Sequence, residues 1–246
     1  QDIKAGRVIL NQGRRLRPED LALAASVGCD RLSVYRRLRV GVLSTGDELV
    51  DPPAPLSAGQ IYNSNHYALL GTLTNEGFEA RDLGRVEDDH EATRVGLSAA
   101  ADEVDCIITS GGVSVGEADH VRDAVMEMGD IDIWRLAIKP GKPLAFGNVK
   151  GTAFFGLPGN PVSTFVTCRM IALPYLRRCQ GQRDIMPRWL WATADFSWQT
   201  QTRREYLRVR LIHDDIGNLR AEAFVEQSSG VMSSVSWADA LAMVDV

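Results

Sequence analysis

The residues with the clearest chemical potential are the glycines and serines of one turn. Residues 109–119 read TSGGVSVGEAD, between a short apolar run and a helical pattern. Backbone N–H groups of such a turn can point at a phosphate or a similar oxyanion beside a helix N-terminus, where the helix dipole favours negative charge. The turn contains neither the Gly-Lys-Ser/Thr of a P-loop nor the GxGxxG of a dinucleotide fold. The sequence therefore predicts an anion-binding turn and disfavours P-loop ATP hydrolysis.

Asp119 ends this turn and has two interpretations. Its carboxylate can cap the helix that follows. Beside a bound phosphate it would instead repel the ligand, unless a divalent cation such as Mg²⁺ lay between them. Asp88, next to Asp89, has the same two interpretations ahead of residues 90–104. Glu48 belongs to the run STGDE, which is either part of a site or a turn with solvated acids.

Two lysines lie three residues apart in the run KPGKP, residues 139–143. The prolines fix φ, so Lys139 and Lys142 can face an anion at little cost in ordering entropy. Residues 40–179 contain 11 basic and 19 acidic residues, which makes a basic pair there informative. A solvent-facing turn with extended lysines is the alternative interpretation.

The elements that must position these groups alternate between strands and helices. Short β-branched runs alternate with amphipathic stretches, a pattern typical of βαβ units and a mostly parallel sheet. Ligands of such sheets collect at the carboxyl ends of the strands, so we expect the turns to meet at one edge. The expected strands cover residues 39–44, 78–83, 105–109, 131–138, 144–146 and 153–155, and the expected helices cover 65–76, 90–104, 119–128 and 161–178.

Composition divides the chain into three parts. Residues 1–39, with nine basic and four acidic residues, are interpreted as a remnant of an N-terminal domain or linker with one helix near residues 17–27. Residues 40–180 form the α/β domain, and residues 181–246 a small β domain. Because the chain begins at Gln1, we expect further sequence before it.

The β domain shows strand alternation in place of the helical period. Strands are expected at 189–196, 206–212 and 219–224, with a turn at 215–218. The tryptophans Trp189, Trp191 and Trp198 are expected in its core rather than on a base-stacking surface.

Composition also excludes several classes of protein. The 246 residues are 45% hydrophobic and 24% charged with a net charge of −5, which disfavours a general nucleic-acid binder. A bilayer span of roughly 20 apolar residues is absent from the sequence. Four cysteines without CxxC spacing are expected to be reduced and mostly buried, as in a cytoplasmic protein. Scattered histidines and the lack of GxSxG disfavour a histidine metal site and acyl-enzyme chemistry.

Five motifs occur in a characteristic order: STGDEL at 44–49, GQIYNSN at 59–65, SGGVSVGEAD at 110–119, KPGKP at 139–143 and GLPGNPVS at 156–163. Together they resemble the molybdopterin molybdenumtransferase family, which comprises the MoeA-like proteins and the gephyrin E domain. The resemblance is strong over residues 40–180 and weak in both flanks. The related MogA-type adenylylating enzymes share the fold, but their glycine turn typically reads SGGTG followed by Arg-Asp.

The resemblance implies a three-layer, MogA-like molybdopterin-binding α/β domain with a mostly parallel sheet, followed by a small C-terminal β-barrel-like domain. It implies a cytoplasmic, Mg²⁺-dependent homodimer that takes adenylylated molybdopterin and molybdate and releases AMP and molybdenum cofactor. A MogA-type enzyme and molybdoenzyme apoproteins are implied as further partners. The alternatives are a non-catalytic scaffold, since the gephyrin E domain also binds receptor peptides, and a MogA-like molybdopterin adenylyltransferase.

The family's functional positions carry over by residue. Its acidic positions fall on Asp2, Glu48, Asp88 and Asp119, of which the last three are expected to hold Mg²⁺. Its basic positions fall on Lys139 and Lys142, which with these three acids form the expected catalytic set. The resemblance places the pterin phosphate and the cleft wall near Thr45, Ser110, Gly111, Gly112, Ser114, Pro158 and Pro161. Arg203, Ser228 and Ser229 resemble molybdate-holding positions, and Arg135 stands where family members commonly have lysine.

Overall fold

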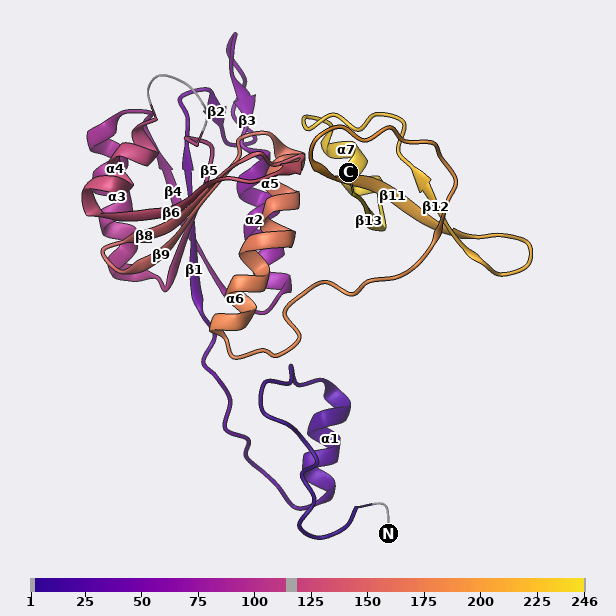
Figure 1. Ribbon diagram of the computed structural model, residues 1–246. Helices are drawn as coiled ribbons and strands as arrows, with labels where there is room; N and C mark the ends of the chain where they lie inside the picture. The colour runs from indigo at the N-terminus through magenta and orange to yellow at the C-terminus, as the bar shows by residue number, and fades with distance from the viewer. Residues whose placement is uncertain (1–2, 114–118, 246) are drawn as a thin grey trace.

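The computed structural model describes residues 3–113 and 119–245. Figure 1 shows an α/β body, a smaller β-rich part beside it, and an N-terminal segment below. The larger body is built around a six-stranded sheet in the order β4-β1-β5-β9-β8-β6. Its strands are β1 (Arg39–Thr45), β4 (Glu79–Val86), β5 (Cys106–Ser110), β6 (Gly129–Arg135), β8 (Pro143–Val149) and β9 (Thr152–Leu157).

The sheet is mostly parallel, as the sequence predicts. β4, β1, β5 and β9 run parallel to one another, and β8 runs antiparallel to both of its neighbours. β5 is buried along its whole length and β1 along all but its first residue, which explains their nearly continuous apolar sequences.

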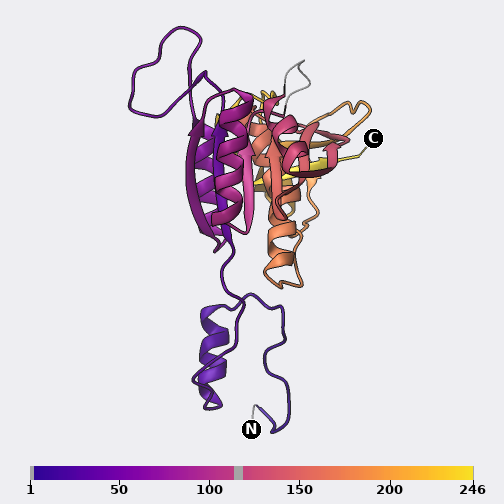
Figure 2. The same ribbon diagram turned by 90° about the vertical axis from the view of Figure 1, so that its left-hand side faces the viewer.

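Helices cover both faces of this sheet, giving three layers (Figures 1 and 2). One face packs against α2 (Ser64–Asn75) and the continuous helix α5 (Pro161–Thr167), η1 (Cys168–Ala172) and α6 (Leu173–Cys179). The other packs against α3 (His90–Glu103) and α4 (His120–Met128). The helix expected over 161–178 is present with a π-helical turn at η1. Pro174, just after that turn, lacks an N–H and therefore cannot continue the α-helical ladder unchanged.

A short pair, β2 (Leu49–Val50) and β3 (Ile61–Tyr62), follows β1 and brackets an exposed excursion. Figure 2 shows this excursion extending beyond the body of the sheet. After β3, the chain enters α2.

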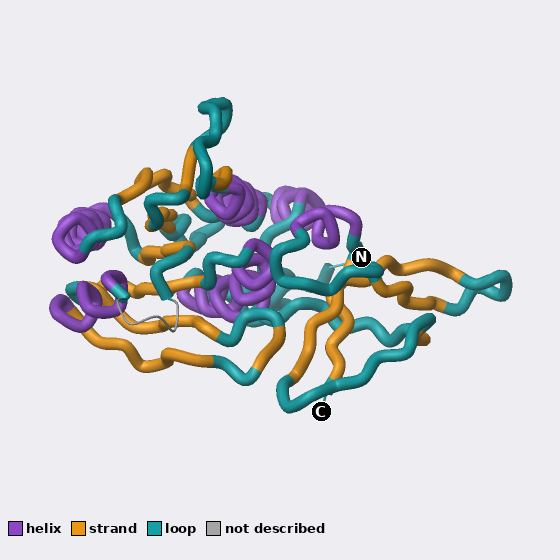
Figure 3. The backbone as a smooth tube through the Cα atoms, turned by 90° about the horizontal axis from the view of Figure 1, so that it is seen from above, coloured by secondary structure: helices purple, strands orange, loops and turns teal. Residues whose placement is uncertain are grey.

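The C-terminal part is a mixed sheet in the order β10-β12-β11-β13, with β7 paired to β11. Figure 3 shows it beside the α/β body. Its elements are β7 (Ile138–Lys139), β10 (Thr193–Ala194), β11 (Arg204–His213), β12 (Leu219–Ala223), α7 (Met232–Trp237) and β13 (Ala240–Val244). The hairpin of β11 and β12 confirms two of the expected strands.

Three expectations, one for the α/β body and two for the C-terminal part, are wrong. The run 131–138 is not one strand, because β6 ends at Arg135 and β7 joins the other sheet. The strand expected over 189–196 is reduced to β10, and β13 was not expected. The tryptophans do not form the core: Trp191 is 98% exposed and Trp189 54%. Smaller aliphatic residues form that core instead, namely Leu207, Val209 and Ala221.

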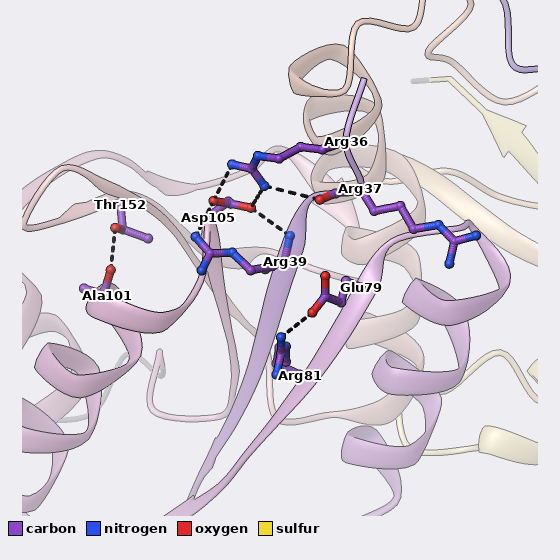
Figure 4. A network of polar contacts seen from close by, with 8 residues as sticks. All are labelled: Arg36, Arg37, Arg39, Glu79, Arg81, Ala101, Asp105 and Thr152. Carbon is purple, nitrogen blue, oxygen red and sulfur yellow. Dashed lines mark hydrogen bonds and ion pairs between the residues drawn. The ribbon is translucent and has the colours of Figure 1, made fainter. Parts of the chain in front are cut away.

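The N-terminal segment contains α1 (Pro18–Ser26) and is clamped to the amino edge of the sheet through Asp105 (Figure 4). The two terminal guanidinium nitrogens of Arg36, Nη1 and Nη2, donate to this carboxylate at 2.5 and 2.8 Å. The Arg39 backbone and side chain donate to it as well, at 2.8 and 3.0 Å. The Arg36 hydrogen bonds, followed by those of Arg39, hold the pKa of Asp105 well below its ordinary value against the opposing effect of burial.

Within the described part of the chain, no helix combines the length and apolar character needed to cross a membrane. The four cysteines are free thiols, as expected, but only two of them are buried. Cys106 and Cys168 lie in the core, whereas Cys29 and Cys179 are exposed.

Candidate active site

The carboxyl ends of four parallel strands stand side by side. Val86 pairs with Thr45, Ser44 with Ser110, and Ser110 with Leu157. Because β8 runs the other way, its first residue, Pro143, lies at this same edge opposite Arg135. The described parts of the turns that the sequence singles out therefore lie at one edge of the sheet: residues 46–48, 87–89, 111–113, 139–143 and 158–161.

The diglycine turn packs tightly against its neighbours. The Gly111 N–H donates to the Leu157 carbonyl at 3.0 Å. Gly112 has φ of +67°, and a Cβ there would lie 2.3 Å from Val121 and 2.9 Å from the Thr45 hydroxyl. Only glycine fits this position without strain, so the backbone is free to approach a ligand closely. Ser114 lies outside the described residues, as does Asp2.

Several hydroxyl groups beneath this turn are buried without a hydrogen-bond partner among the described residues. They belong to Thr45, Thr109 and Ser110, each 3% exposed or less. An unsatisfied buried polar group costs free energy, and in a native structure it commonly marks a place where water, an ion or a ligand binds. These groups are therefore suited to hydrogen bonding with a bound oxyanion.

The structure confirms the helix-cap interpretation of Asp119, and its second carboxylate oxygen leaves the cation-ligand interpretation as a prediction. One carboxylate oxygen caps α4 by accepting the Arg122 N–H at 2.8 Å. The other oxygen, Oδ2, is buried without a partner among the described residues. Burial, reinforced by the negative charges of Asp123 and Asp88, raises the pKa of Asp119 to about 6, although the hydrogen bond from Arg122 opposes this shift. A buried carboxylate oxygen with free lone pairs is chemically suited to a cation.

Of the other two expected acids, Asp88 lines an open hollow of about 580 Å³, whereas Glu48 is not among the residues that line it. Asp89 caps α3 by accepting the Ala92 N–H at 3.0 Å, which leaves the Asp88 carboxylate free of that role. The Asp88 N–H donates to Asp47 Oδ1 at 3.1 Å, and the exposed Glu48 carboxylate folds back over Gly46. Among the described residues, no three His, Cys, Asp or Glu side chains are grouped so that they could hold a metal ion. Mg²⁺ is usually held by one or two carboxylates together with water and substrate phosphates, and carboxylates such as those of Asp119 and Asp88 are chemically suited to this ion.

The basic side of the site is assembled from two sheets. Lys139 pairs in register with Glu205 through β7 and β11, and its Nζ lies 3.3 Å from Glu205 Oε2. Arg203, one residue before β11, donates to the Ile138 carbonyl at 3.1 Å. Lys142 is exposed on the same KPGKP turn. The structure thus places Arg203 beside β7, which contains Lys139, with Lys142 three residues further along the same turn.

Arg208 was missed by the sequence reasoning. It is 1% exposed, donates to Ser234 Oγ at 2.9 Å and to the Ser228 carbonyl at 3.0 Å, and burial lowers its pKa. It thereby fixes the 228–229 turn, whose Ser229 carbonyl accepts the Val162 N–H at 3.0 Å at the start of α5. The period-two alternation of β11, which places Arg208 on the face of Tyr206, is the signal that would have found it.

Two asparagines of the GQIYNSN motif also had no assigned role. Asn63 is 3% exposed and donates to the Ser44 hydroxyl at 3.0 Å. Asn65 donates to the Gly159 carbonyl at 2.7 Å. They tie the start of α2 to β1 and to the 158–161 turn, and so fix the distance between two walls of the site.

The three-layer sheet with a glycine-rich carboxyl edge places this chain among the α/β domains that bind ligands at the strand ends, and comparison with known proteins identifies which class of these it is. Residues 41–178 match the family model described as a probable molybdopterin binding domain, and residues 192–246 match the MoeA C-terminal region, domain IV. The chain belongs to the MoeA-like molybdopterin molybdenumtransferase family, which confirms the resemblance.

Individual relatives agree with this assignment. The chain is 45% identical over 184 residues to a molybdopterin molybdenumtransferase of Haemophilus influenzae, covering 75% of this chain and 46% of that protein. It is 38% identical over 182 residues to one from Nostoc, covering 72% and 42%. The solved molybdopterin biosynthesis MoeA protein of Pyrococcus horikoshii superposes with a TM-score of 0.82 at 32% identity, covering 99% of this chain and 59% of that one. The chain thus spans about half the length of the curated relatives it matches.

Proposed function

We propose that this chain carries the molybdopterin-binding and C-terminal parts of a molybdopterin molybdenumtransferase. The reaction inserts molybdenum from molybdate into adenylylated molybdopterin and releases AMP. The proposal is supported by three groups at the carboxyl edge of the sheet: the diglycine turn, the Asp119 oxygen that has no partner among the described residues, and the basic side chains of Lys139, Lys142 and Arg203. Breaking a phosphoanhydride needs charge neutralisation and donors that face the phosphate, and these groups supply both.

The acidic side would hold Mg²⁺, which would neutralise negative charge on the phosphates of the substrate. Asp119 Oδ2 offers a buried, unpaired ligand, and Asp88 and Glu48 lie on neighbouring turns. When bound, Mg²⁺ neutralises charge on the phosphate oxygens and polarises the phosphorus that water attacks. The N–H groups of the diglycine turn and the hydroxyls of Thr45 and Ser110 would orient the phosphate.

The basic side would attract molybdate, a dianionic substrate, next to the dithiolene sulfurs of the pterin. Lys142 is exposed and offers a mobile ammonium group, whereas Lys139 is held by Glu205. Arg203 stands beside them at the start of β11. Pro158 and Pro161 stiffen the adjoining wall through their fixed φ angles.

Three further features are proposed for this protein. They are a homodimeric state, a cytoplasmic location, and exchange of substrate and product with a MogA-type enzyme and with molybdoenzyme apoproteins. Each follows from family membership alone.

An assay of AMP release tests the function. The chain is mixed with adenylylated molybdopterin, Mg²⁺ and molybdate, and AMP and molybdenum cofactor are quantified together. We expect molybdate-stimulated AMP release with matching cofactor formation. Binding of adenylylated molybdopterin without turnover would favour a scaffold, and AMP-pterin formation from ATP and free molybdopterin would favour an adenylyltransferase.

A further inference from the structure

Arg85 lies near the carboxyl end of β4, in register with Ser44 of β1. Its Nη1 donates to the Leu49 carbonyl at 2.6 Å and to the Gly46 carbonyl at 3.4 Å. One guanidinium nitrogen therefore bridges both ends of the turn that follows β1. A charged donor makes stronger hydrogen bonds than a neutral one, so this bridge braces the turn against β4.

The braced turn carries two acidic residues: Asp47, which lines the hollow, and Glu48, whose carboxylate folds back over Gly46. Gly46, with φ of +133°, leaves room for the Glu48 carboxylate, since a Cβ there would lie 2.6 Å from Glu48 Oε2. Asp47 accepts the Asp88 N–H at 3.1 Å, so the same turn is also tied to the chain that follows β4. Together, the hydrogen bonds of Arg85 and the bond between Asp47 and Asp88 hold the turn 46–49 against β4 and the chain that follows it.

The positive charge of Arg85 would weaken the binding of a cation, whereas its bracing of the turn would strengthen it. Of the described residues that line the acidic hollow, Arg85 is the one that carries positive charge, beside Asp47, Asp51, Glu87, Asp88 and Asp89. Coulomb repulsion alone makes a guanidinium there unfavourable for a bound divalent cation. Replacing Arg85 should therefore lower the affinity for a divalent cation if bracing dominates, and raise it if charge repulsion dominates.

We propose that Arg85 is a positioning residue that sets the affinity of this edge for a divalent cation by bracing the turn 46–49. The inference rests on the proposed Mg²⁺ site, which it deepens. Replacing residues that orient metal ligands from outside the coordination shell typically lowers metal affinity 10–100-fold. Arg85→Gln removes the bridge and the charge, whereas Arg85→Lys keeps the charge but falls one bond short of the carbonyls.

The test is a Mn²⁺ titration of the whole chain followed by electron paramagnetic resonance, without AMP and with AMP present to supply phosphate oxygens. Arg81→Gln is the matched control, because Arg81 lies on the same strand, is exposed and pairs with Glu79 away from the hollow. We expect Mn²⁺ affinity to fall roughly tenfold or more in Arg85→Gln, and to a smaller extent in Arg85→Lys. Arg81→Gln should bind Mn²⁺ as the wild type does.

Tighter Mn²⁺ binding by Arg85→Gln with an unchanged Arg85→Lys would mean that charge dominates, and would overturn the inference. Equal binding by all variants, or no binding by the wild type in either condition, would overturn it as well. Loss of Mn²⁺ binding in Arg85→Gln together with a wild type that releases no AMP would support the inference and reject the proposed activity. The melting temperature of each variant separates a loosened turn from a general loss of folding.

Discussion

Lys139, in the strand β7 that joins the C-terminal sheet, forms an ion pair with the buried Glu205 of β11, with Nζ and Oε2 3.3 Å apart. Glu205 also accepts a hydrogen bond from the Trp198 indole N–H at 3.1 Å, and this bond holds the Glu205 carboxylate in place. The pairing of β7 with β11 is what brings these residues together. The C-terminal sheet therefore completes the basic side of the candidate site.

Asp119 should govern the pH dependence of turnover. Its pKa is raised to about 6, and only the ionised carboxylate can hold a cation. We predict that AMP release by the wild type rises with pH through about 6 and that Asp119→Asn loses at least about 100-fold in rate at pH 7. Rates of AMP release at fixed Mg²⁺ concentration between pH 5 and 8 measure this. A variant rate within a factor of two of the wild type would remove Asp119 from the mechanism.

Asp119→Asn should also stabilise the fold at neutral pH. Because the folded-state pKa is raised above the ordinary 3.8, the folded state binds this proton more tightly, and stability falls as pH rises from about 4 to about 6. Asparagine still caps a helix but carries no charge. Allowing for partial exposure, we predict a gain on the order of 1 kcal/mol at pH 7 that vanishes near pH 4.

Urea unfolding at both pH values checks this gain. Asp89→Asn is the matched control, because Asp89 caps α3 from an exposed position. It should change stability little at either pH. A loss of stability in Asp119→Asn at pH 7 would show that burial of this carboxylate carries no penalty.

Gly112→Ala should damage the site through a clash as well as through backbone strain. The added Cβ would meet Val121 at 2.3 Å and Thr45 Oγ1 at 2.9 Å. We predict a loss of about 2–4 kcal/mol in the free energy of unfolding, measured by chemical denaturation. Gly151→Ala is the control, since Gly151 has φ of +81° but nothing within 4 Å of a Cβ. It should lose only about 1 kcal/mol, and equal losses would mean that the clash is relieved.

Much of the α/β body could be predicted because its central strands β1 and β5 are almost fully buried and because turn residues flank several of its helices. Glycines and prolines marked the ends of α2, α4 and α5, and buried apolar runs marked β1 and β5. The C-terminal part was harder to predict. There Arg208 is buried and Trp191 is exposed, so a prediction of burial from side-chain hydrophobicity fails at both positions.

Residues of the candidate site could be proposed because parallel strands place distant turns at one edge. The sequence did not reveal how those turns are tied together. The bonds of Arg85 to two carbonyls and of Asn65 to Gly159 join residues 36 to 94 positions apart, and neither leaves a local pattern. The transfer of β7 to a second sheet is likewise a tertiary event, since nothing in the run 131–138 marks the break.

Lys142→Ala should weaken the response to molybdate. Removing one exposed ammonium from an anion site costs about 1.4 kcal/mol, so we predict that half-maximal turnover needs roughly tenfold more molybdate, with little change in the rate at saturation. Lys150→Ala, an exposed lysine of the β8–β9 turn at the opposite edge, serves as the control. An unchanged molybdate curve in Lys142→Ala would remove this lysine from the anion site.

Asp105→Asn should loosen the N-terminal segment. Because its pKa is lowered in the folded state, the ionised carboxylate stabilises the fold above its ordinary pKa, and this contribution is lost only in strong acid. We predict a loss of about 1–2 kcal/mol at pH 7 and faster proteolysis near Arg36. Asp102→Asn, at an exposed position of α3, is the control. Identical proteolysis of the two variants would argue against the clamp.

The most direct measurement is a crystal structure of the chain with adenylylated molybdopterin. Such a structure should place the diphosphate against Gly111 and Gly112, with a cation on Asp119 and with Lys142 facing the dithiolene end. A ligand bound instead at the amino edge, beside Arg36 and Asp105, would contradict the proposed site.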